Sequence, residues 1–173
     1  TLRSRGLGDV YKRQVELYIP PKKGKSHVLR IIRELLEFKS KSKKTDINVP
    51  LKFVSNILKN RSIAFIISDF ISQDYSNSLK IFSSRHDVTG IRIFDKTEEI
   101  IPNLGVIDIN DNETGKRTTV NTSSKKIRRK YNEYYNSKRR EFMDYFKRSG
   151  SGIIECNTND DYQKKLLKYF KSR

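Results

Sequence analysis

Several absences in the sequence limit what kind of protein it can be. Cys156 is the single cysteine among 173 residues, so no disulfide can form within the chain, which fits a reducing compartment. No apolar run approaches the ~20 residues that a membrane-spanning helix needs, and the N-terminus lacks the apolar core of a signal peptide. We therefore expect a cytoplasmic protein. Two histidines and one cysteine are also too few for a zinc site of the usual ligand composition.

Acidic residues are scarce beside basic ones. Lys and Arg number 37 against 20 Asp and Glu, which gives a formal net charge of +17. Such a balance attracts nucleic acid, anionic lipid or an acidic protein surface. Lys, Asn and Ile are all abundant here, however, and AT-rich codons favour these three residues. The basic residues are spread over the whole chain, so compositional bias is the simpler explanation.

The stretch VELYIPPKKGKSHVLRII, residues 15–32, has the order strand, GKS, helix that is typical of a phosphate-binding loop. That loop needs a glycine five residues before the GKS glycine, and Ile19 stands there instead. Pro20 and Pro21 follow, and they have no amide hydrogen to donate to a phosphate. The stretch therefore predicts a turn, with Ser26 capping the helix that follows, and no nucleotide site.

Strand and helix patterns alternate along the rest of the chain. A mostly parallel sheet with helices on both faces follows from this alternation. The run 62–68 is continuously apolar, which predicts a strand covered on both faces. Asp69 and Asp95 directly follow two strands, where such sheets bind ligands. The expected strands are 15–19, 62–68, 88–94, 152–158 and a hairpin of 105–111 with 116–122, and the expected helices are 26–38, 47–58, 75–85, 124–148 and 159–173.

Two stretches have more than one interpretation. Helix 124–148 carries aromatic residues at helical spacing among basic ones, so it is either a core stripe with a solvated basic face or a surface for nucleic acid. Its basic face could also dock on an acidic protein. The tripeptide Arg85-His86-Asp87 places a histidine beside an acid, but at the amino end of a strand, away from the usual site of chemistry. An Arg85–Asp87 pair or a capped turn is the better interpretation there, and we expect no catalytic residues.

Several stretches in the right order resemble the C-terminal part of a bacterial family, domain of unknown function 58: VELYIPPKKGKSHVLRIIRELL, TDINVPLKFV, RSIAFIISDF, SSRHDVTGIRIFDKTEEIIPNLGVIDINDNETG and DDYQKKLLKYFKSR. That family is similar to von Willebrand factor A domains. The resemblance implies a doubly wound sheet and a metal-ion-dependent adhesion site in which an Asp-x-Ser-x-Ser loop, a Thr and an Asp hold Mg²⁺. By position the Thr is Thr45 and the Asp is Asp69, while the Asp-x-Ser-x-Ser loop has no counterpart. Thr45 as a helix N-cap and Asp69 as a strand-end cap are the alternatives.

The resemblance also sets expectations about domains and partners. Residues 1–14, TLRSRGLGDVYKRQ, resemble sequencing-adaptor read-through in metagenomic assemblies. Residues 15–173 would then be a truncated von Willebrand A-like domain, an incomplete doubly wound sheet lacking its first two strands. The implied partners are a MoxR-type AAA+ ATPase and other A-domain proteins, in protein assembly or activation. We expect a non-enzymatic interaction domain, with Mg²⁺ only in the full-length protein. A nucleic-acid-binding module using helix 124–148 is the alternative.

Overall fold

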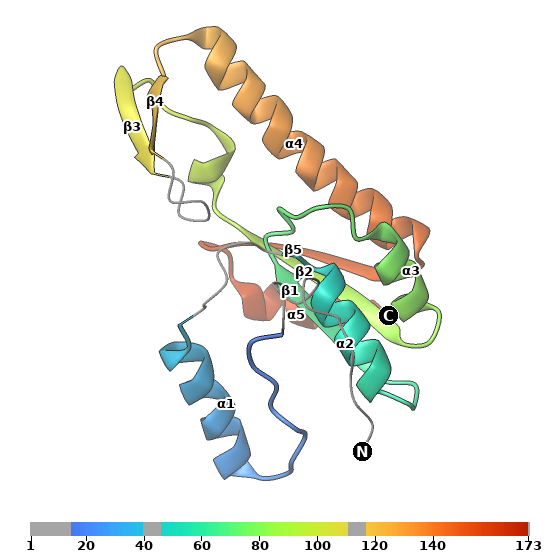
Figure 1. Cartoon of the computed structure of the whole chain (residues 1–173). Coiled ribbons are helices and arrows are strands. Elements are labelled where there is room, and N and C mark those ends of the chain that lie inside the picture. The colour runs from blue at the N-terminus through green and yellow to red at the C-terminus, as the bar shows by residue number, and fades with distance from the viewer. Residues whose placement is uncertain (1–14, 40–45, 111–116, 173) are drawn as a thin grey trace, which may run out of the picture.

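The computed structural model describes residues 15–39, 46–110 and 117–172, and its centre is a three-stranded parallel sheet (Figure 1). The strands are β1 (Ile63–Ser68), β2 (Asp87–Phe94) and β5 (Gly152–Asn157), in the order β1-β2-β5. Both pairings are parallel, with Ile63 opposite Asp87 and Thr89 opposite Gly152. The mixed α/β class and the mostly parallel sheet predicted from the sequence are therefore confirmed.

One face of the sheet holds the hydrophobic core. It is covered by α2 (Asn48–Ile57), α3 (Ser76–Ser83) and α4 (Lys125–Arg148). Phe142 and Phe146 of α4 are fully buried, and the ideal Cβ position of Gly90 on β2 lies 2.5 Å from Phe146 Cε1. Because residue 90 has no side chain, α4 can lie directly on the strand. The aromatic stripe of α4 is thus core, as the first of the two interpretations predicted.

The opposite face is covered by α5 (Tyr162–Lys171), so helices lie on both faces of the sheet. The hydroxyl of Tyr169 lies 3.0 Å from the hydroxyl of Thr89 on β2. Phe170 meets Phe65 of β1 edge to face at a centroid distance of 5.9 Å, an arrangement that aromatic pairs prefer. Asp161 caps α5 by accepting a hydrogen bond from Lys164 N, so the helix begins three residues later than the predicted range 159–173.

The predicted hairpin forms a second, antiparallel sheet of β3 (Val106–Asn110) and β4 (Arg117–Asn121). It lies beside the N-terminal half of α4, away from the parallel sheet, after the short 3₁₀ helix η1 (Lys96–Glu99) (Figure 1). Buried Thr122 fixes its base, since the hydroxyl accepts from Leu104 N and donates to Gly105 O. Asn132 of α4 donates to the carbonyl of Glu99 at 3.0 Å and holds the helix to this region.

The expected first strand, residues 15–19, does not form. A strand needs a partner for its backbone groups, and this segment pairs with no strand in the described chain. Tyr18 instead packs edge-on against Phe53 of α2 at 5.5 Å. The following helix, α1 (Lys25–Glu37), forms as predicted, but Gly24 rather than Ser26 precedes it, and none of its residues is buried. No helix among the described residues is long and apolar enough to cross a bilayer.

The prediction that β1 is covered on both faces is wrong. Ala64 and Ile66 pack against the core, whereas Ile63, Phe65 and Ile67 are 68%, 45% and 62% exposed. The cause is position: β1 is at one edge of the described sheet, where Phe170 of α5 packs against Phe65 but leaves Ile63 and Ile67 exposed. A continuous apolar run cannot by itself distinguish a central strand from an edge strand.

Candidate functional site

The three parallel strands end side by side at Ser68, Phe94 and Asn157, and this carboxyl edge carries a group of hydrogen-bonded loops. Asp69 follows β1 and Asp95 follows β2, as the sequence predicted. Loops beyond the carboxyl ends of parallel strands are where such sheets usually bind their ligands. The edge is therefore the first place to look for a functional site.

Asp95 closes the end of β2 and is tied to the end of β5. Its Oδ1 accepts from the amide and the hydroxyl of Thr97 at 2.8 and 2.9 Å, and its Oδ2 accepts from the Thr158 hydroxyl at 3.2 Å. These bonds favour the carboxylate, and the one from the Thr97 amide contributes most to lowering the pKa of Asp95 below its usual value. Asp95 thus holds the loops in place through both of its oxygens.

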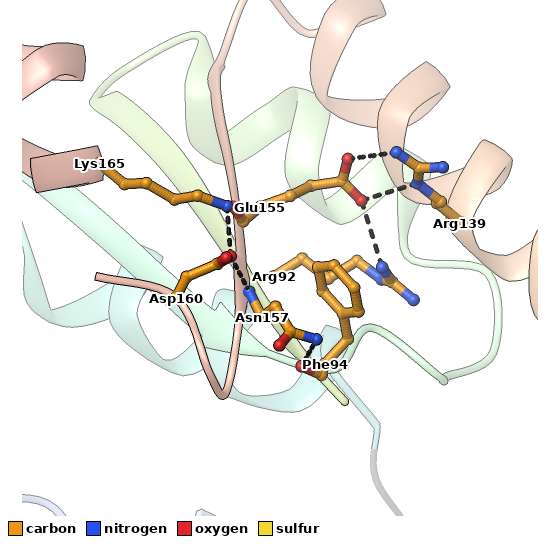
Figure 2. A network of polar contacts seen from close by, with 7 residues as sticks. All are labelled: Arg92, Phe94, Arg139, Glu155, Asn157, Asp160 and Lys165. Carbon is orange, nitrogen blue, oxygen red and sulfur yellow. Dashed lines mark hydrogen bonds and ion pairs between the residues drawn. The ribbon is translucent and has the colours of Figure 1, made fainter. Parts of the chain in front are cut away.

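Asn157 and Asp160 form the turn after β5 (Figure 2). Asp160 Oδ2 accepts from the Asn157 amide at 2.7 Å and from the ammonium of Lys165 on α5. Lys165 also donates to the carbonyl of Glu155 at 2.8 Å. The hydrogen bond from Lys165, followed by that from Asn157, lowers the pKa of Asp160. The start of α5 is thereby fixed against the end of the sheet.

Behind these loops, Arg92 of β2 is 2% exposed and is held by charge and by aromatic rings. Its Nη1 donates to Glu155 Oε1 at 3.2 Å, and its guanidinium lies 4.7 Å from the ring centroid of Phe94. It also lies 5.1 Å from the ring centroid of Tyr135 on α4. Glu155 also receives two hydrogen bonds from Arg139 of α4, which is the largest reason why the pKa of Glu155 is lowered (Figure 2). One carboxylate thus joins two arginines, on β2 and on α4.

The sequence interpretation missed this group, although a signal was present. Arg92 interrupts an apolar strand, and the period of two places it on the same face as Val88 and Gly90, which is the core face. A charged residue on a core face needs a partner. Only the fold shows that the partner is Glu155, because that residue is 63 positions away.

Asp69 is placed by an unusual backbone conformation at its neighbour. Phe70 has φ 58°, in the left-handed region that a bulky residue rarely adopts, and it is the described chain's only residue other than glycine with positive φ. Its ring is buried and stacks on Phe142 at 4.3 Å. Asp69 remains exposed, and its Oδ1 accepts from Ile71 N at 3.0 Å and from Ser68 Oγ at 3.2 Å. Both hydrogen bonds come from residues next to the end of β1, so Asp69 closes the loop that follows this strand.

Comparison with protein families identifies the chain. A family model described as "Protein of unknown function DUF58" matches residues 6–141. The chain belongs to the DUF58 family. An uncharacterized protein of Mycobacterium avium is 26% identical over 116 residues, which cover 66% of this chain and 68% of that protein. The crystal structure of an aerotolerance-related membrane protein from Bacteroides fragilis NCTC 9343 with multiple mutations to serines matches with a TM-score of 0.45 and 13% identity, over 85% of this chain and 70% of that chain.

Of the two metal ligands that the family resemblance implies, the described part of this DUF58 chain contains one, Asp69. Thr45 lies outside the described residues. Among the described residues, the side-chain oxygen that is hydrogen-bonded to the Asp69 carboxylate is the Ser68 hydroxyl, which donates to it. Within residues 15–39, 46–110 and 117–172, no three His, Cys, Asp or Glu side chains gather as a metal site would require. One carboxylate and one hydroxyl are too few for the octahedron that Mg²⁺ prefers, unless water supplies the rest.

The remaining candidates of the DUF58 chain have structural positions. Cys156 is buried, as a small apolar residue would be. His86 is buried at the amino end of β2, opposite to the edge that carries Asp69. The turn before β2 is closed by the backbone amides of exposed Arg85 and of His86, which both donate to Phe82 O. Exposed Asp69 at the carboxyl edge is therefore the candidate functional residue that remains.

Proposed function

We propose that this chain is a non-enzymatic protein-interaction domain of the von Willebrand A type. Its binding surface is the carboxyl edge of the parallel sheet, centred on Asp69. The hairpin of β3 and β4 and the N-terminal half of α4 extend the domain beyond the sheet. The order β1-β2-β5 with parallel pairing and helices on both faces supports the doubly wound assignment.

The observation that carries the proposal is the conformation of Phe70. A non-glycine residue in the left-handed region costs free energy, on the order of 1–3 kcal/mol, and such residues cluster at functional sites. Here the cost is offset by the burial of the Phe70 ring against Phe142 and Phe146. The result is that Asp69 projects from a rigid corner. A fixed carboxylate needs no ordering on binding, which favours association.

The partner that we propose is a MoxR-type AAA+ ATPase, together with other A-domain proteins, in the assembly or activation of further proteins. On a chain of net charge +17, an exposed carboxylate at the sheet edge is a local exception. It would meet a basic or amide-rich patch on the partner. The family resemblance motivates the choice of this partner.

A pull-down with the purified ATPase tests the proposal. Asp69→Ala should reduce capture at least tenfold, whereas Asp144→Ala should leave it unchanged. Asp144 is an exposed residue of α4, so its removal makes the same change in charge far from the edge. Asp69→Asn keeps the oxygen that accepts from Ile71 N but removes the charge. It therefore distinguishes an effect of the lost charge from an effect of a disturbed loop. Equal capture by Asp69→Ala and wild type would refute the binding surface.

A separate pull-down tests whether Thr45 and Asp69 bind Mg²⁺ at the interface. If Mg²⁺ bridges the two proteins, chelator should abolish capture and Mg²⁺ should restore it, and Thr45→Val should behave like Asp69→Ala. Capture that resists chelator but fails with Asp69→Ala would show direct contact of the carboxylate. Catalysis by the chain itself is not part of this proposal.

Nucleic-acid binding by residues 124–148 is the alternative outcome. The structure favours it less, because Tyr135, Phe142 and Phe146 are buried and only Tyr134 among the tyrosines and phenylalanines of α4 is more than half exposed. Stacking of bases needs exposed aromatic rings. Filter binding of single-stranded oligonucleotides at two salt concentrations would detect it as affinity that falls steeply with salt.

A further inference from the structure

Helix α1 has an apolar face that the described part of the chain leaves uncovered. Five of its side chains are between 48% and 81% exposed, namely Val28, Leu29, Ile32, Leu35 and Leu36. They recur at the spacing of one helix face, and α1 lies apart from the parallel sheet (Figure 1). A helix of 13 residues is marginal in water by itself, because helices in proteins are stabilised mainly by packing of such a face. α1 therefore needs a surface on which to pack.

A second uncovered apolar surface lies on the face of the sheet that carries α5. Phe65 of β1 contacts Phe170 of α5, and both rings are about half exposed. Ile63 and Ile67 point to the same face as Phe65, because side chains alternate along a strand, and they are more exposed still. Leu167, one helical turn before Phe170, is 59% exposed. These five side chains form an apolar surface, called the β1–α5 strip below.

The charges beside the two surfaces are opposite in sign. Three lysines of α5 line an open hollow together with Leu167, namely Lys164, Lys168 and Lys171. Glu34 and Glu37 lie at the C-terminal end of α1, and the last turn of that helix contains no basic residue. Carboxylates at this end of a helix are disfavoured by the helix dipole, so a cationic surface beside them would be stabilising. The lysines of α5 provide such a surface.

We propose that the β1–α5 strip binds α1 of a second copy of this chain, so that two copies form a reciprocal dimer. Each copy supplies one helix and one strip, and a two-fold arrangement of this kind is closed. The helix would also cover the edge of the described sheet at β1, which is one way in which proteins protect such edges. The two contacts would remove on the order of 1,000 Å² of apolar surface from water, which reaches the roughly 1,000 Å² expected of a specific interface.

The chain itself holds α1 on the other side of the sheet from its own strip. Tyr18, before α1, packs on Phe53 of α2 at a centroid distance of 5.5 Å, and α2 is also the next helix after α1. Both ends of α1 are thus joined to a helix that covers the core face, through Ile47 and Leu51 among others. A second copy can bring its α1 to the opposite face without this constraint.

Sedimentation velocity of the full chain at increasing concentration tests for the dimer. We expect a reversible equilibrium between monomer and dimer. Ile32→Gln/Leu36→Gln should raise the dimer Kd at least tenfold. Ile81→Gln/Met143→Gln removes two exposed apolar side chains of α3 and α4 instead, and should change the Kd less than twofold. A monomer at every concentration, or equal weakening by both pairs of changes, would overturn the proposal.

A charge exchange between copies distinguishes the dimer from α1 folding back on its own strip. Lys168→Glu/Lys171→Glu and Glu34→Lys/Glu37→Lys should each weaken self-association at least tenfold, because like charges then meet in both contacts. In an equimolar mixture of the two variants, both contacts join opposite charges, so a mixed dimer should form with a Kd within about threefold of wild type. A mixture that remains monomeric would overturn the assignment to a second copy.

Hydrogen exchange locates the contact within the chain. The backbone amides of α1 should exchange at least tenfold more slowly in the dimer than in the monomer, since an uncovered short helix opens readily. Ile32→Gln/Leu36→Gln should abolish this protection. Dimerisation without protection of α1 would overturn the helix as the bound element, and protection of α1 in the monomer would show that the helix covers its own strip.

Discussion

Arg139 of α4 and Glu155 of β5 form a two-point ion pair, with Nε to Oε1 at 2.9 Å and Nη2 to Oε2 at 2.8 Å. The same Glu155 Oε1 accepts from buried Arg92. This carboxylate therefore fixes the direction of α4 relative to the sheet and neutralises a guanidinium that is shielded from water. Two consequences can be measured.

Replacing Glu155 by Gln should destabilise the domain by about 2 kcal/mol, because hydrogen bonds to charged groups are each worth roughly 1.5–3 kcal/mol and Arg92 would lose its counter-charge. Chemical denaturation measures the change. Glu133→Gln is the matched control, since Glu133 pairs with Arg129 at 3.4 Å but both side chains are more than 60% exposed. That control should stay within about 0.5 kcal/mol of wild type. Equal effects of the two changes would contradict the role of Glu155.

The lowered pKa of Glu155 gives its contribution a definite dependence on pH. Because the pKa is lower in the folded state than in the unfolded chain, the stabilisation is fully present above the usual glutamate pKa and is lost as pH falls through the folded value. The difference in unfolding free energy between wild type and Glu155→Gln should therefore shrink as the pH falls from about 6 to about 3. Denaturant titrations at several pH values measure it. A difference that is constant with pH would show that the pair is not ionic.

The sequence predicted much of this fold because local patterns specify most of its elements. The alternation of strands and helices, the hairpin and the long helix ending at Arg148 all carry strong periodicity. The strand predicted for residues 15–19 does not form, because a strand needs another strand to pair with, and periodicity carries no information about that partner. The prediction that β1 is covered on both faces failed for a similar reason. Its apolar residues correctly predict a strand, but the exposure of that strand depends on which elements lie beside it.

The same limit separates the candidate site residues that could be predicted from those that could not. Asp69 and Asp95 could be found because strand ends are visible in the sequence and parallel strands end at one edge. The group around buried Arg92 could not, because Arg92, Glu155 and Arg139 come together only when β2, β5 and α4 pack against one another. The left-handed conformation at residue 70 could not be predicted either, because the residue there is a phenylalanine and not the glycine or asparagine that usually adopts it.

Gly90→Ala should destabilise the domain by about 1–3 kcal/mol, because a methyl group there would overlap rings that cannot retreat from a packed core. Its ideal Cβ would lie 2.5 Å from Phe146 Cε1 and 2.9 Å from Phe142 Cε2. Gly152→Ala is a useful comparison. Its new methyl would lie 1.7 Å from the hydroxyl of Tyr169 and 2.8 Å from Thr89 Oγ1, but that hydroxyl is the far end of a partly exposed side chain that can move away. Thermal unfolding should rank Gly90→Ala as the more damaging change. The reverse order would show that α5 is held more rigidly than α4.

The exposed residues of β1 should promote self-association of the chain. Within the described residues β1 pairs on one side only, and Ile63 and Ile67 are more than 60% exposed beside that open edge. Such apolar edges invite pairing with other chains. Ile63→Thr/Ile67→Thr keeps β-branched side chains and should leave the unfolding free energy within about 0.5 kcal/mol while reducing self-association in sedimentation velocity. Ile66→Thr, on the core face, should instead lower stability without that benefit. Unchanged association in the double variant would show that the β1 edge is covered in solution.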